Sequence, residues 1–249
     1  MVITSATIDP HLFVHYFGGN CPVVNVPGRT YPVDVIYRNE WRNQPESSID
    51  RDYVKDAVEQ TCKLHESEPP GDFVIFLTSA IEIERACQLT LNKLGDSAIV
   101  LPLHGRLQPE DQQKVFKEYN KRKIVFSTNV AETSVTIPGV KCIVDTGLAK
   151  ELCFDPKKNM NSLEFRLISK SSAEQRKGRA GRTSAGKCYR LYSEDVYSRM
   201  SSKSLPEILC VTLASTVLKL YEFGVTDVIS FNFVEEPDRV TLEAAVESL

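Results

Sequence analysis

Between residues 72 and 145 the sequence alternates short apolar runs with polar segments that carry helix-start signals. Four runs have the length of a strand: Phe73–Leu77, Ile99–Leu103, Lys123–Phe126 and Val140–Val144. They show little polar alternation, which is typical of strands buried on both faces. The segments between them begin as helices do, for example with Ser79 three residues before Glu82. Repeated β–α units predict an α/β fold, in which a parallel sheet is flanked by helices and ligands bind at the carboxyl ends of the strands.

Other stretches extend this pattern on both sides. Strands are predicted at Val33–Tyr37 and Lys187–Tyr192, and a helix is expected from about Asp50 to His65. Leu152–Phe154 and Leu163–Leu167 flank a polar turn, which predicts a β-hairpin that protrudes from the sheet.

The two ends of the chain suggest a larger protein. Val2–Thr7 resembles the end of a buried strand that enters a turn, which is a rare way for a domain to begin. Helices are predicted from Pro206 to about Gly224 and from Val240 to Leu249, and the last of these has no stop signal. We therefore expect the chain to be a part of a longer protein.

The composition limits the kinds of function that the chain can have. A net charge of -3 and a pI of about 5.9 argue against a generally basic nucleic-acid coat, so any polyanion site must be local. Residues 176–190 offer such a site, because they contain six Lys or Arg and no acid. The seven Cys are scattered and odd in number, which predicts core thiols in a reducing compartment. Without a signal peptide or an apolar run near 18 residues, we expect a soluble, intracellular protein away from membranes, in either the nucleus or the cytoplasm.

The most distinctive stretch is the basic run QRKGRAGR. Ser171 and Glu174 have the spacing of a capping box, so a helix is predicted to begin there. On that helix Gln175, Arg179 and Arg182 fall at i, i+4 and i+7 and share one face. Two guanidinium groups and an amide with no local acid suit a polyanion such as a nucleoside triphosphate.

The plain alternative for this run is a solvated basic helix, which is what most charge runs form. Gly178 and Gly181 argue against it, because each costs about 1 kcal/mol relative to Ala in a helix interior. What a glycine permits in return is the close approach of another backbone or of a ligand. We therefore favour a binding role.

Polar residues follow five of the predicted strands. They are Ser5 and Thr7; Thr78 and Ser79; His104, Gly105 and Arg106; Ser127, Thr128 and Asn129; and Asp145, Thr146 and Gly147. Each could cap a helix structurally, but hydroxyl and backbone N–H groups at successive strand ends also suit phosphate.

Taken together, these segments resemble the DEAH-box family of superfamily 2 helicases. The matching segments are Ser5–Thr7 (SAT, motif III), Phe76–Ser79 (motif IV), Leu101–Phe116, Ser127–Ser134 (motif V) and Gln175–Arg182 (motif VI). The resemblance implies that residues 1–20 end a first RecA-like domain, 21–200 form a second RecA-like domain, and 201–249 begin a winged-helix region. Ser79 departs from the family pattern, which usually has Gly there.

The resemblance also implies a nucleotide site. Its residues would be Gln175, Arg179, Arg182, Phe116 and Thr136. The two arginines would act as fingers on the phosphoryl group of ATP that is transferred, Phe116 would stack on adenine, and Thr136 would contact the ribose. An equal alternative for Phe116 is that it fills a core. Pro138 stands where many relatives have an acid, which puts ribose selectivity in question.

A second implied site would hold single-stranded RNA by its backbone. Its residues would be Thr128, Asn129, Gly105 and Arg106. Ser5 and Thr7 of the SAT motif would couple this site to the nucleotide, and the hairpin at 151–169 would separate strands.

Two motifs that an ATPase needs are absent. The sequence has no G-x-x-x-x-G-K-[ST] loop and no Asp-Glu-Ala-His stretch, so the phosphate-binding Lys, the Mg²⁺ ligand and the acid that orients water are missing. We expect the chain to hold half of an ATPase site, inactive alone, whose Mg²⁺ ligands come mainly from a first RecA-like domain of the same protein. The alternative is a helicase-like RNA- or protein-binding module without ATPase activity. A DNA helicase is disfavoured only by the habits of the family.

Overall fold

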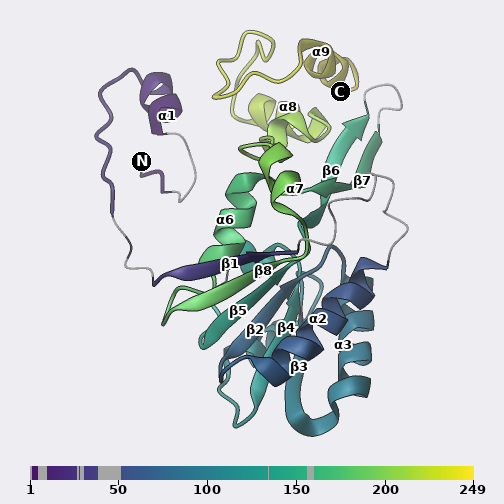
Figure 1. Cartoon of the computed structure of the whole chain (residues 1–249). Coiled ribbons are helices and arrows are strands. Elements are labelled where there is room, and N and C mark those ends of the chain that lie inside the picture. Colours follow the sequence, from purple (N-terminus) through teal and green to yellow (C-terminus); the bar gives the residue numbers. More distant parts are fainter. Residues whose placement is uncertain are drawn as a thin grey trace. The chain divides into compact units, whose positions relative to one another are not determined.

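The computed structural model describes residues 2–4, 10–26, 28, 31–38, 52–133, 135–155 and 160–249. The chain divides into two compact units (Figure 1). The first unit contains residues 1–28, 151–164 and 205–249, and the second contains residues 29–150 and 165–204. Ser5, Thr7 and Ser134 lie outside the described residues.

The second unit is built on a six-stranded sheet with the order β1-β8-β5-β2-β4-β3. Its strands are β1 (Val33–Tyr37), β2 (Asp72–Phe76), β3 (Ala98–Leu103), β4 (Arg122–Ser127), β5 (Val140–Asp145) and β8 (Gly186–Arg190). All neighbouring strands are parallel. The predicted parallel α/β sheet is therefore confirmed, and each predicted strand lies within one or two residues of its observed bounds.

Helices cover both faces of this sheet (Figure 1). They are α2 (Tyr53–Ser67), α3 (Ala80–Leu94), α4 (Pro109–Gln113), α5 (Val130–Thr133), α6 (Lys170–Gly178) and α7 (Glu194–Arg199). Asp52 caps α2, because its side chain accepts a hydrogen bond from the N–H of Lys55, so this helix begins slightly later than predicted. Short 3₁₀ turns follow α3 at Gly95–Ser97 and α4 at Lys114–Phe116.

The alternation of side chains along β2 sorts the core into two layers. Phe73 and Ile75 pack with buried residues of α2 and α3, and we call this side the α2/α3 face. Val74 and Phe76 point the other way, toward Ala131 of α5 and the end of α6, and this side is the α5/α6 face. Because both faces of the strand are covered, β2 is apolar along nearly its whole length.

Helix α6 differs from its prediction at both ends. Its N-cap is Ser169, whose hydroxyl accepts from the N–H of Ser172 at 3.1 Å, so the expected capping box at Ser171 is wrong. The helix ends at Gly178, so Arg182 lies beyond it rather than on its face. The physical cause is an alternative partner for the backbone, since the carbonyl of Gly181 accepts from the N–H of Tyr31 at 2.8 Å.

The first unit contains the remaining helices. They are α1 (Pro10–Tyr16), α8 (Ala214–Glu222) and α9 (Arg239–Glu247), with a 3₁₀ turn at Glu207–Leu209. Leu213, Val217 and Leu242 form the centre of a small apolar cluster around α8 and α9. The single helix predicted from Pro206 is therefore wrong, because the chain breaks between the 3₁₀ turn and α8, although its end near Gly224 is confirmed by a left-handed φ of 85°.

Two further expectations concern the hairpin and the start of the chain. Strands β6 (Leu148–Asp155) and β7 (Met160–Leu167) form a separate two-stranded sheet, which confirms the predicted hairpin. Residues 2–4 form no strand, and the side chain of Val2 is largely exposed, so the strand expected there is not observed in the described part of that segment.

Candidate functional site

Four of the predicted polar clusters follow β2, β3, β4 and β5, and these strands are neighbours in the sheet. The clusters therefore share one edge, as expected for a parallel sheet. Some of their hydroxyl groups are used internally, since Thr146 donates to the carbonyl of Phe76 at 2.8 Å and Ser127 donates to that of Thr128 at 2.9 Å. The groups left toward solvent are those of the loops after β3 and β4.

These two loops are adjacent. The N–H of Thr128 donates to the carbonyl of Leu103, the last residue of β3, at 3.2 Å. The ring of buried His104 accepts from the N–H of Arg106 at 3.3 Å and holds the next turn. Gly105, Arg106 and Asn129 are exposed, and Thr128 is half-buried. The structure thus brings together Gly105, Arg106, Thr128 and Asn129, the four residues predicted to hold a nucleic-acid backbone.

The end of β2 carries a different arrangement. Ser79 is the N-cap of α3, but its side chain makes no capping bond to the backbone. Instead its hydroxyl donates to the carboxylate of Glu82 at 2.8 Å, and Thr78 donates to the same carboxylate at 2.5 Å. The expected capping box is therefore formed only between side chains, and the hydroxyl of Ser79 is engaged with Glu82.

The arginines of the basic run lie in a second place, on the segment between α6 and β8. Arg179 Nη1 donates to the carbonyl of Val135 at 3.2 Å, and Arg182 donates to the hydroxyl of Thr136. The Nε of Arg179 is buried without a hydrogen-bond partner. Within the described residues neither arginine pairs with a carboxylate, whereas Arg176 of the same run pairs with two. Among the described residues the two guanidinium groups are therefore unpaired by acids, as expected from the sequence, although the charge of Glu132 still acts on Arg179.

A small recess of about 10 Å³ lies against these two side chains. Its other walls are Val74, Ala131, Val135, Ile137 and Val140. Partial burial, and then the charge of Arg182, lower the pKa of Arg179 to about 10. Since 10 is still well above neutral pH, Arg179 remains a cation, and an anion would relieve its repulsion from Arg182. Val140 is the first residue of β5, so this site lies toward the amino ends of the strands and not at the carboxyl edge that α/β sheets usually favour.

Other predicted nucleotide residues lie near this site or are accessible. Thr136 is exposed and contacts Arg182 directly. Gln175 is half-buried on α6, one turn before Arg179. Phe116 is 43% exposed in the 3₁₀ turn after α4, while its neighbour Val115 is fully buried, so Val115 and not Phe116 fills the core there.

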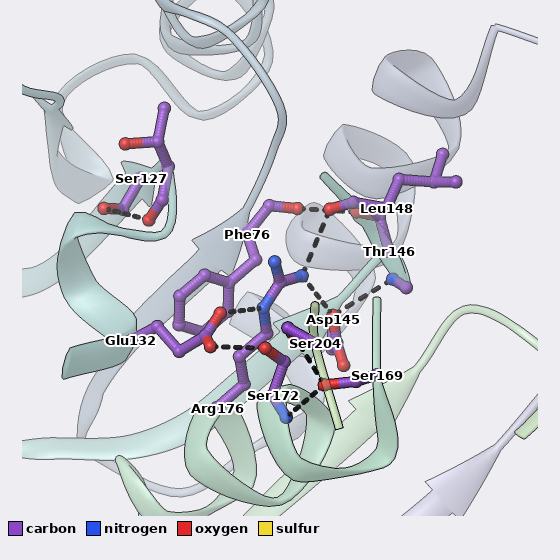
Figure 2. A network of polar contacts seen from close by, with 12 residues as sticks. Phe76, Ser127, Glu132, Asp145, Thr146, Leu148, Ser169, Ser172, Arg176 and Ser204 are labelled. Atoms are coloured by element: carbon purple, nitrogen blue, oxygen red, sulfur yellow. Dashed lines mark hydrogen bonds and ion pairs between the residues drawn. The ribbon is translucent and has the colours of Figure 1, made fainter. Parts of the chain in front are cut away.

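Sequence reasoning missed a buried polar network centred on Arg176 (Figure 2). Its Nε donates to Glu132 at 3.0 Å, its Nη1 donates to Asp145 at 2.8 Å, and the guanidinium lies 4.7 Å from the ring centroid of Phe76. Burial opposes this charge, but the carboxylates of Asp145 and Glu132 outweigh burial and raise the pKa of Arg176. The sequence did hold a sign of this burial. Arg176 lies three residues after Ala173 and therefore on the same side of the helix, and an alanine on a helix otherwise made of polar residues indicates the buried side.

The described residues hold neither a candidate metal-binding cluster nor a helix that could span a membrane. No three side chains of His, Cys, Asp or Glu are placed there to hold a metal ion. None of the described helices is both long and apolar enough to cross a bilayer.

A parallel sheet flanked by helices, with polar loops at the strand ends, is the architecture of a RecA-like α/β domain. Residues 56–184 match the model of the helicase conserved C-terminal domain. The chain is 41% identical over its whole length to "Pre-mRNA-splicing factor ATP-dependent RNA helicase prp22" of Schizosaccharomyces pombe, of which it covers 21%. It is also 41% identical to "ATP-dependent RNA helicase DEAH12, chloroplastic" of Arabidopsis thaliana, of which it covers 14%.

Solved structures agree. The Escherichia coli DEAH/RHA helicase HrpB superposes with a TM-score of 0.87 at 30% identity, over 98% of this chain and 30% of that one. A second structure, described as the E. coli DExH-box NTPase HrpB, gives a TM-score of 0.83 at 29% identity, over 98% of this chain and 29% of that one. The chain therefore belongs to the helicase conserved C-terminal domain family, as the second RecA-like domain of a DEAH-box protein of superfamily 2. It spans about a fifth or less of the length of the curated relatives named above.

Proposed function

We propose that this chain is the part of an ATP-dependent RNA helicase that supplies the arginine fingers and the RNA-backbone contacts. The observation that carries the proposal is the state of Arg179 and Arg182, two adjacent cations without a carboxylate partner among the described residues. A buried Nε with no acceptor is costly unless something else satisfies it. A phosphate oxygen fits this requirement. The names of the relatives, which are ATP-dependent RNA helicases, support the same activity.

The roles on the nucleotide side follow from position. Arg179 and Arg182 stabilise the charge that grows on the γ-phosphoryl group, and Gln175 reaches the same phosphates. Thr136, which already accepts from Arg182, contacts the ribose, and exposed Phe116 stacks on adenine. When ATP is bound, it supplies the phosphoryl group whose transfer these side chains assist.

The roles on the RNA side fall on the adjacent loops after β3 and β4. Backbone N–H groups and the side chains of Thr128, Asn129 and Arg106 bind phosphates, and Gly105 leaves room for the strand to approach. Such contacts carry no sequence information, so the domain binds RNA without sequence specificity. The hairpin of β6 and β7 separates strands.

The remaining parts come from outside this domain. We propose that a first RecA-like domain, whose end is residues 1–20 with Ser5 and Thr7 as coupling residues, brings the phosphate-binding loop and most ligands of Mg²⁺. Residues 21–200 form the second RecA-like domain and 201–249 the start of a winged-helix region. We place the protein inside the cell, in either the nucleus or the cytoplasm.

The test compares this chain with a longer one. Phosphate release from ATP with Mg²⁺ and single-stranded RNA is expected to be absent for the 249-residue chain, and present and RNA-stimulated for a protein that adds its preceding domain. Turnover by this chain alone would contradict the half-site. RNA binding by the longer protein without any turnover would instead favour a binding module without ATPase activity.

A further inference from the structure

The buried ion pair between Glu132 and Arg176 joins the two places that the proposed function needs. Glu132 belongs to α5, the single helical turn that directly follows Thr128 and Asn129. Arg176 belongs to the last turns of α6, directly before Arg179. Resting on that proposed function, we infer that Glu132 and Arg176 are positioning residues that make the RNA-binding turn and the arginine-finger segment move as one body.

Two contacts fix Glu132 to α6, and a third fixes it to the RNA-binding turn. One carboxylate oxygen accepts from Arg176 Nε at 3.0 Å, and the other accepts from the hydroxyl of Ser172 at 2.6 Å (Figure 2). On the other side the N–H of Glu132 donates to the carbonyl of Asn129 at 2.9 Å. The residue is therefore held by α6 through its side chain and by the RNA-binding turn through its backbone.

Arg176 extends the same connection. Its Nη1 donates to Asp145 at 2.8 Å and to the carbonyl of Leu148 at 3.3 Å, at the end of β5 and the base of the hairpin. Its own carbonyl accepts from the N–H of Arg179 at 3.1 Å. The arginine is 1% exposed, so the cost of leaving either partner uncompensated keeps the set together. A shift of the fingers on the nucleotide thus reaches Asn129 through two side chains.

The chain offers a matched control on the same helix. Glu174 pairs with Arg190, another fully buried arginine, at 2.8 Å. That pair connects α6 to β8 and makes no described contact with the turn at residues 128–133. Glu132→Gln and Glu174→Gln each remove one carboxylate charge that pairs with a buried arginine, the Glu174 side chain being the more exposed of the two, at 43% against 9%. Only the first substitution acts on the RNA-binding turn.

In the longer helicase we expect Glu132→Gln to lower the ratio of RNA-stimulated to unstimulated ATP turnover by about tenfold, with unstimulated turnover within about threefold of wild type. Glu174→Gln should keep this ratio within about twofold of wild type, even if it lowers the melting temperature as much as Glu132→Gln does. Equal losses of the ratio in the two variants, in proportion to their melting temperatures, would mean a merely structural role and would overturn the inference.

A second measurement decides the matter without ATP. By amide hydrogen exchange on the 249-residue chain, Glu132→Gln should speed exchange at Ala131, Glu132 and Arg179 together by about tenfold, and Glu174→Gln should leave Ala131 and the residue 132 amide unchanged. If the two segments respond separately, the connection is refuted. If the longer wild-type protein shows no RNA-stimulated turnover, the proposed function fails, but the exchange result still tests the connection.

Discussion

The two faces of the sheet differ in the length of their helices and in the residues of their cores. On the α2/α3 face, two helices of 15 residues each cover a continuous apolar layer that includes Phe73, Ile75 and Ile83. On the α5/α6 face the helices have four and nine residues, and Arg176 lies buried within the layer. The core of one face is thus an apolar cluster, whereas the core of the other combines an apolar cluster with buried charge pairs.

The difference between the two faces bears on where ligands can bind. Long amphipathic helices are stabilised by packing, and the spacing of their apolar residues predicts them from the sequence. Short helices are marginal by themselves and need tertiary partners, which here are ion pairs and hydrogen bonds. Those partners are also the groups that can respond to ligands, and the less regular face carries the recess beside Arg179 and Arg182.

The largest expected effect belongs to the arginines of the α5/α6 face. In the longer helicase, Arg179→Ala or Arg182→Ala should lower ATP turnover by about 10³-fold or more, because a finger stabilises charge that grows only in the transition state. RNA binding should persist, since neither residue lies on the loops after β3 and β4. Phosphate release and RNA titration measure the two quantities separately.

The control for this prediction is Lys177→Ala, which removes a cation from the same basic run. Lys177 pairs with Glu174 and does not line the recess. Turnover within about twofold of wild type is expected for it. Full turnover in Arg182→Ala would remove the finger assignment.

The next effect compares the cores of the two faces. Ile83→Ala on the α2/α3 face should cost about 2–5 kcal/mol of unfolding free energy, because it empties a fully buried site. Arg176→Ala on the other face should cost about 3–5 kcal/mol, because it leaves Glu132 and Asp145 as uncompensated buried charges. Urea unfolding measures both.

Adding Glu132→Gln should change the unfolding free energy of these two variants in opposite directions. Adding Glu132→Gln to Arg176→Ala should recover part of the loss, since one unpaired carboxylate is removed, whereas it should add to the loss from Ile83→Ala. Strict additivity in both backgrounds would show that the Glu132 pair does not matter to the α5/α6 face.

The sequence predicted what periodicity and composition control. The strands, the hairpin and the parallel sheet follow from apolar runs and turn signals, and the basic run pointed to an anion site from charge alone. The paired state of Arg176 was harder to predict, because its partners Glu132 and Asp145 are 44 and 31 residues away in the chain. Only the fold brings them together, although the alanine spacing around Arg176 marked its side of the helix as buried.

Boundaries failed where a distant backbone competes with the local pattern. Arg182 was predicted on a helical face, yet α6 ends at Gly178 because the following segment binds the backbone before β1 through Gly181. The helical-face argument for Arg182 is therefore wrong, while its assignment from the motif stays a prediction. Helical spacing could not reveal this, since the partner, Tyr31, lies about 150 residues earlier.

The two glycines of the basic run provide the finest test of that explanation. A Cβ at Gly181 would lie 2.6 Å from the carbonyl oxygen of Tyr31 and 2.8 Å from a methyl group of Val33, while a Cβ at Gly178 would meet nothing within 4 Å. Gly181→Ala should therefore destabilise the domain by about 1–3 kcal/mol. Gly178→Ala should be neutral or stabilise it by up to about 1 kcal/mol, because alanine favours the helix more than glycine does. Thermal unfolding of the pair measures the difference, and equal effects would mean that the contact with Tyr31 does not end α6.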